Sequence, residues 1–123
     1  MKSKVFNTIP ELKPSIYTEA LIAGEFATIH SENVRYDHKR GRFLIWDKNY
    51  WREDRTQAIT RLIISFAEML KLEGEEIRDK KLEECGIKLQ SSARIKNITS
   101  LIKASKPIPL TGDEFDTKPM LLG

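Results

Sequence analysis

The spacing of the apolar residues changes twice along this chain, and this change constrains the fold more than any other feature. Residues 15–30 carry apolar side chains at helical intervals, residues 34–53 are rich in β-branched and aromatic residues, and residues 55–71 return to a helical period. This order of patterns is typical of an α+β protein. We expect a mostly helical domain in which a short antiparallel β-meander packs on a small helical bundle.

Two turn signals divide the aromatic-rich segment into strands. The sequence His38-Lys-Arg-Gly41 ends in a glycine that can adopt a positive φ, and Asp47-Lys-Asn49 offers an asparagine for the same purpose. Strands are therefore predicted at about residues 34–38, 42–47 and 50–53.

The predicted central strand is apolar on both faces. Phe43 and Ile45 point one way, and Leu44 and Trp46 point the other way, because successive side chains of a strand alternate. Both faces should therefore be covered by the rest of the domain, and Trp46 should be largely buried. The other interpretation of Trp46 and Trp51 is that they stack on unpaired bases, since both lie among arginines and lysines.

The first and last predicted helices begin at polar capping residues. The first helix should begin near Ser15 or Thr18 and leave two acidic side chains in water. These side chains are Glu19 and Glu25. The last helix should cover about residues 92–105, with Ser91 or Ser92 as its cap.

The strongest helical pattern lies between these two helices. It covers about residues 55–71 and starts at Asp54, which with Gln57 resembles a capping box. Gly74 should end or interrupt this helix. A charged, exposed helix is expected next, closing near Gly86.

The length of the chain, 123 residues, fits one domain. Residues 1–14 are expected to be an irregular lead-in, residues 15–110 the domain, and residues 111–123 an extended tail leading to a missing C-terminal module. No apolar run is long enough to span a membrane, and the N-terminus lacks the apolar segment of a signal peptide. Cys85 is the only cysteine, which rules out an internal disulfide and favours the cytoplasm.

The basic residues are unevenly distributed, although the net charge is only +3. Residues 33–55 hold seven basic and four acidic side chains, and residues 87–109 hold five basic side chains and no acidic one. Such clusters are candidate contacts for nucleic-acid phosphates, although a solvated face is an equally good interpretation. The predicted DNA-binding residues are Arg35, Lys39, Arg40, Arg42, Arg94, Lys96 and Lys103.

Residues able to support catalysis or metal binding are sparse. The sequence contains no GxxxxGK[ST] phosphate loop, and His30 and His38 lie on different predicted elements without carboxylates at metal-ligand spacing. The acidic residues at 113–116 resemble a turn or cap more than a set of magnesium ligands. Cys85 is expected to be an inert thiol. We therefore predict no catalytic residue, no metal site and no cofactor.

A set of short motifs gives the chain a family resemblance. The motifs are Arg35-Tyr36, Gly41, Phe43-Leu-Ile-Trp46-Asp47, Trp51, Glu53-Asp54, Ser91 to Ile95 followed by Ile98 and Leu101, and Phe115-Asp-Thr-Lys-Pro119-Met-Leu-Leu122. In this order they resemble the domain that precedes the superfamily-3 helicase in poxvirus-type and phage or plasmid primase-helicases. The family has glycine after Trp-Asp where this chain has Lys48, so Asn49 is expected to take the positive φ instead.

The resemblance implies a non-catalytic accessory domain of a viral, phage or plasmid DNA primase-helicase in the host cytoplasm. It would couple the primase and helicase modules and help bind template DNA through the phosphate backbone, independently of sequence. The parent protein would be a primase, a superfamily-3 helicase with ATPase activity, or both, and this chain a fragment or a stand-alone remnant of it. The alternative is a protein–protein interaction or oligomerisation module of a replication protein with no direct DNA contact.

Overall fold

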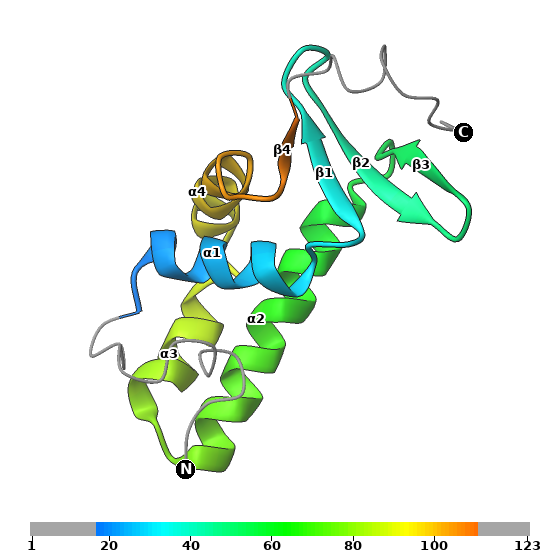
Figure 1. The fold of residues 1–123 in the computed structure, drawn as a ribbon. Coiled ribbons are helices and arrows are strands. Elements are labelled where there is room, and N and C mark those ends of the chain that lie inside the picture. The colour runs from blue at the N-terminus through cyan, green and yellow to red at the C-terminus, as the bar shows by residue number, and fades with distance from the viewer. Residues whose placement is uncertain (1–16, 111–123) are drawn as a thin grey trace.

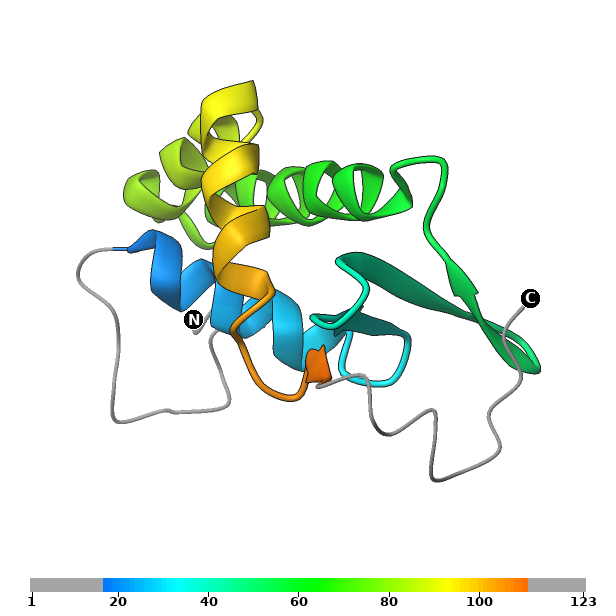
Figure 2. The ribbon, with the colours of Figure 1, turned by 90° about the horizontal axis from the view of Figure 1, so that it is seen from above.

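The computed structural model describes residues 17–110, which form four helices and a four-stranded sheet (Figure 1). In chain order the elements are α1 (Glu19–Ile29), β1 (Val34–Asp37), β2 (Arg42–Asp47), β3 (Tyr50–Glu53), α2 (Ala58–Ile77), α3 (Lys80–Lys88), α4 (Ser92–Ile102) and β4 (Pro109–Leu110). The sheet lies at the end of the helical bundle where α2 begins, and the β2–β3 hairpin projects away from the helices (Figures 1 and 2). The mostly helical α+β prediction is confirmed.

The predicted meander is present with almost the predicted bounds. The strand order is β3-β2-β1-β4, with antiparallel β1–β2 and β2–β3 pairs. The short strand β4 pairs in parallel with β1 and was not predicted, because Pro107 and Pro109 signalled only the end of a helix. At the β2–β3 turn it is Lys48, with φ 62°, that takes the left-handed conformation, so the expectation for Asn49 was wrong.

The inner face of the sheet joins the hydrophobic core of the helices. The pairs Val34–Ile45 and Tyr36–Phe43 lie on this face, where Val34 and Phe43 are buried. The core continues into α1 and α2 through Phe26 and other apolar side chains. The alternation predicted for β2 is therefore confirmed on this side of the sheet.

The outer face of the sheet is covered less completely than predicted. Leu44 is fully buried, but Trp46 has 41% of its surface exposed. The prediction that Trp46 is largely buried was therefore wrong. The reason is its position, because Trp46 lies in the second strand pair from the β2–β3 turn. This hairpin projects away from the helices (Figure 1).

The N-terminus of α2 is capped by Asp54, as predicted, but not through a capping box. The Asp54 carboxylate accepts hydrogen bonds from the backbone N–H groups of Ala58 (2.8 Å) and Ile59 (2.9 Å). Gln57 has φ 58° and lies before the helix, so its side chain does not complete the reciprocal pair. The helix thus begins three residues later than expected.

Gly74 and Gly86 lie inside helices and do not end them. A Cβ atom on Gly74 would lie 2.4 Å from the backbone nitrogen of Glu83, and one on Gly86 would lie 2.4 Å from the backbone nitrogen of Lys71. Both glycines therefore allow α2 and α3 to approach backbone to backbone. The predicted break at Gly74 was wrong, because a glycine required for close packing has the same sequence signal as one that ends a helix. The next helix does close near Gly86 as predicted, since α3 ends at Lys88.

The first and last helices agree with their predicted positions, apart from one buried acid. Helix α1 is capped by Thr18 and α4 by Ser91, although α4 ends at Ile102, three residues early. Glu25 is buried rather than exposed, because burial extends around more than half of the circumference of α1. Within residues 17–110, no helix has both the length and the apolar character needed to cross a membrane.

Candidate nucleic-acid interface

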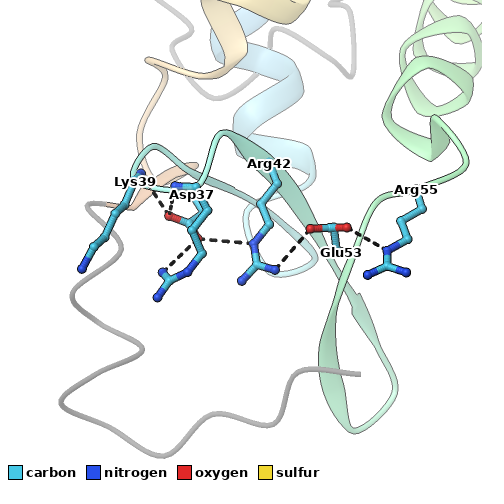
Figure 3. A network of polar contacts seen from close by, with 6 residues as sticks. Asp37, Lys39, Arg42, Glu53 and Arg55 are labelled. Carbon is cyan, nitrogen blue, oxygen red and sulfur yellow. Dashed lines mark hydrogen bonds and ion pairs between the residues drawn. The ribbon is translucent and has the colours of Figure 1, made fainter.

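The β1–β2 turn is organised around a buried carboxylate, that of Asp37. Its Oδ1 accepts hydrogen bonds from the backbone N–H groups of Lys39 (3.1 Å) and Arg40 (3.2 Å). Its Oδ2 lies 3.3 Å from the guanidinium of Arg40 and 3.4 Å from Nε of Arg42 (Figure 3). Burial alone would raise the pKa of Asp37, but the bonds from Arg40 and Arg42 outweigh it and lower this pKa. The ionised carboxylate therefore holds the turn and both arginines in place.

The same network continues across the sheet to the start of α2. Arg42 also lies 3.3 Å from Glu53, whose other carboxylate oxygen accepts a 2.8 Å hydrogen bond from Arg55 (Figure 3). The hydrogen bonds from Arg55 and Arg42 lower the pKa of Glu53. Arg42 is thus shared between two carboxylates, so much of its charge is compensated within the protein.

Lys103 links the last helix to the β1–β2 hairpin. Its Nζ lies 4.8 Å from the centre of the Tyr36 ring and 6.0 Å from that of Phe43, within the range of a cation–π contact. The ring of His38 also lies against α4, since its Nε2 is 2.9 Å from the carbonyl oxygen of Lys103. The fold therefore brings one of the last helix's basic residues onto the meander.

One open cleft is lined by side chains from the β1–β2 hairpin, from the segment that leads into α2, and from the end of α4. We call it the hairpin cleft. Its lining residues are Tyr36, Arg40, Gly41, Arg42, Phe43, Glu53, Asp54, Arg55, Gln57, Ile59 and Lys103. Four of these are cationic and two are anionic, so positive charge is in excess. Arg55 was not predicted as a site residue, because its own stretch of sequence also contains Glu53 and Asp54.

The other two basic residues of α4, Arg94 and Lys96, do not line the hairpin cleft. Arg94 and Lys103 are nine residues apart, or about two and a half helical turns, which places them on opposite sides of the helix. Arg94 lies 3.9 Å from Glu19 of α1 and lines a different pocket. Lys96 is exposed and shares the Lys103 side, since seven residues make about two turns. Residues 87–109 contain no acidic side chain, but Glu19 of α1 partly neutralises Arg94.

Arg35 and Lys39 occupy different surroundings on β1 and its turn. Arg35 donates hydrogen bonds to the backbone carbonyls of Ser31 and Val34, and its Cζ lies 5.4 Å from the Trp51 ring centre. The side chain of Lys39 is exposed at the β1–β2 turn. Of the seven predicted DNA-binding residues, only Arg40, Arg42 and Lys103 line one common cleft.

The histidine and cysteine considered for metal binding or catalysis lie in surroundings that are typical of structural residues. Burial lowers the pKa of His30, which is partly buried and packs against Phe26. Burial raises the pKa of the Cys85 thiol to about 11, so it is a poor nucleophile near neutral pH. Among residues 17–110, no three His, Cys, Asp or Glu side chains come together as a metal site. The acidic residues at 113–116 lie outside the described residues.

These elements define a small α+β domain in which a β-meander with a basic cleft is set on a helical bundle. A comparison with family models places the chain by its sequence: the model described as "D5 N terminal like" matches residues 23–123, and the chain belongs to this family. The family is the non-catalytic N-terminal domain of D5-type primase-helicase proteins, which are replication proteins of viral or phage origin. No curated protein and no solved structure matches the chain.

Proposed function

We propose that this domain couples the primase and helicase modules of its parent protein and helps to hold the template DNA. The parent protein would carry the primase or helicase activity and act in the host cytoplasm, with the helicase module following residues 111–123. The domain would contribute binding surfaces only. Family membership supports the replication context, and the hairpin cleft supports the contact with DNA.

The observation that carries the DNA-binding proposal is the position of Lys103 against the β1–β2 hairpin. It adds a cation from α4 to Arg40 and Arg42 at the cleft, although these residues are more than sixty positions apart in sequence. Cations fixed in one cleft displace counterions from a phosphate backbone without reading the bases. Binding should therefore be independent of sequence, weak for the single domain and strongly dependent on salt.

The test is fluorescence anisotropy of labelled oligonucleotides with the 123-residue chain at several salt concentrations. A variant with Arg94, Lys96 and Lys103 all changed to Gln should keep its circular-dichroism spectrum and lose affinity for every sequence alike. None of these three residues is among the buried residues of α4, which are Ile98 and Ile102. Absence of wild-type binding at about 50 mM salt, or unchanged binding by the variant, would contradict the DNA role.

A second candidate function is protein contact without DNA, and an apolar cleft on α2 favours it. The cleft is lined by Ile29, Ser65, Glu68, Met69, Leu72, Glu73 and Glu76. Leu72 is 52% exposed, and the acidic rim suits a module that presents apolar residues beside lysines or arginines. The test measures association of the chain with separately purified helicase or primase modules. If Leu72→Asp abolishes this association and the wild type does not bind DNA, protein contact replaces DNA binding as the proposed function.

A further inference from the structure

The outer face of the β2–β3 hairpin presents a pair of tryptophans to solvent. Trp46 and Trp51 are direct partners across the two strands, and their ring centroids are 5.4 Å apart at an interplanar angle of 65°. Trp51 therefore supports the Trp46 ring in an edge-to-face contact. Because Trp46 remains 41% exposed, part of this large aromatic surface is open to a ligand.

A guanidinium group lies beside this aromatic pair. Arg35 is held in place by the carbonyls of Ser31 and Val34, and it sits over the ring of Trp51. Desolvation lowers the pKa of Arg35, but an arginine keeps its charge in proteins. Among residues 17–110, Arg35 takes part in none of the salt bridges that join arginines to carboxylates on this sheet. The tryptophan pair therefore adjoins a positive charge that no described carboxylate neutralises.

The turn of the hairpin adds one more cation. Lys48 is exposed at the β2–β3 turn, whereas Arg52 of β3 pairs with Ile45 on the opposite face from the tryptophans and lies 3.4 Å from Asp47. The hairpin thus combines a supported aromatic ring with neighbouring basic groups. This is the combination that binds single-stranded nucleic acid, since a base stacks on the ring while cations contact the phosphates.

We propose that Trp46 stacks on an unpaired base, so that this hairpin makes the domain prefer single-stranded over double-stranded nucleic acid. The inference rests on the proposed DNA-holding function and adds the class of DNA that is held. In a duplex the bases are already stacked on one another and offer no face to Trp46. Arg35 keeps guanidinium N–H groups beyond those bound to the two carbonyls, and these contact the phosphate next to the stacked base.

The experiment compares three ligands of about 15 nucleotides: oligothymidylate, the corresponding duplex, and an abasic strand with the same phosphates. The readouts are anisotropy and the intrinsic fluorescence of Trp46 and Trp51, the two tryptophans of the chain. Wild type should bind oligothymidylate about 5- to 150-fold more tightly than the abasic strand, with quenching by oligothymidylate alone. Equal affinity for both strands would overturn the inference without requiring any variant to fold.

Variants then assign the effect to Trp46. Trp46→Ala should lose the preference for oligothymidylate over the abasic strand, whereas Trp46→Phe should keep most of it because phenylalanine also stacks. Ile87→Ala, which removes another exposed apolar side chain, on α3, should change nothing. A Trp46→Ala variant that folds and keeps the preference would overturn the inference.

The two proposals fail in different ways. Salt-dependent binding that is equal for the thymidylate and abasic strands would leave the phosphate contacts standing and remove the stacking role of Trp46. Absence of wild-type binding to all three ligands at about 50 mM salt would remove both proposals.

Discussion

The ammonium group of Lys103 lies 4.8 Å from the centre of the Tyr36 ring, joining the end of α4 to the first strand of the meander. This contact links two basic segments that are far apart in sequence. The basic residues of the last helix do not act on one surface, because Lys103 faces the β1–β2 hairpin whereas Arg94 lies beside Glu19 of α1. The cationic surface is therefore a cleft at the meander and not the whole length of the helix.

The Asp37 network should make the fold sensitive to acid. The pKa of Asp37 is lowered in the folded state, so its contribution is complete above the ordinary aspartate pKa of about 3.9 and is lost as the pH falls through the lower folded value. Asp37→Asn should cost about 1–3 kcal/mol at neutral pH, because buried hydrogen bonds to charged partners are weakened.

Urea denaturation of the wild type and Asp37→Asn at about pH 7 and about pH 3 would measure this effect. The difference in free energy of unfolding between the two proteins should be smaller at the lower pH. The exposed Glu32→Gln serves as the control and should change little at either pH. A stability difference for Asp37→Asn that is the same at both pH values would argue against an ionised Asp37 as the centre of the turn.

The close approach of α2 and α3 should make Gly86 intolerant of any side chain. A Cβ there would lie 2.4 Å from the backbone nitrogen of Lys71 and 2.6 Å from the carbonyl oxygen of Ala67. Gly86→Ala should therefore destabilise the domain by about 1–3 kcal/mol or more, as overpacking does.

Gly24 provides the matched control, because it lies inside α1 and a methyl group added there would have no other atom within 4 Å outside its own helix backbone and chain neighbours. Gly24→Ala should raise stability by up to about 1 kcal/mol through helix propensity. Thermal melts of both variants would compare them directly. Similar effects of the two substitutions would show that α2 and α3 do not meet at Gly86.

Trp46 should contribute less to stability than a core aromatic residue. Its exposed position leaves mainly the edge-to-face contact with Trp51, so Trp46→Ala should cost about 1 kcal/mol. Phe26 is fully buried and packs on Phe66, so Phe26→Ala should cost about 3–5 kcal/mol. Equal losses in chemical denaturation would mean that Trp46 is a core residue after all.

The purified chain should neither hydrolyse ATP nor extend primers, since its sequence has no phosphate-binding loop and its family is a non-catalytic domain. A magnesium-dependent phosphate-release assay on rigorously purified protein would check this. The control is a mock preparation from the same host without the chain. ATP turnover that co-purifies with the folded chain and exceeds the control would contradict the prediction.

Local sequence patterns predicted the elements of this fold well. The strands at 42–47 and 50–53 and the Asp54 cap follow from alternation, turn residues and capping chemistry, all of which act over a few residues. The roles of Gly74 and Gly86 were not predictable in this way, because they depend on a backbone that a distant helix brings nearby.

The candidate site was less predictable for the same physical reason. Charge density along the chain singled out Arg40, Arg42 and Lys103, which line one cleft, as candidates. It could not reveal that Asp37 and Glu53 partly compensate the arginines. The exposure of Trp46 was missed because alternation identifies the face of a strand and not what covers that face.

The most direct test of the account is the salt dependence of DNA binding for two single variants, Lys103→Gln and Arg94→Gln. Lys103 lines the hairpin cleft, whereas Arg94 lies beside Glu19 on the other side of α4. Lys103→Gln should weaken binding to every sequence and reduce the slope of log affinity against log salt by about one unit, while Arg94→Gln leaves that slope nearly unchanged. Equal slopes for the wild type and Lys103→Gln would contradict the hairpin cleft as the phosphate-binding surface.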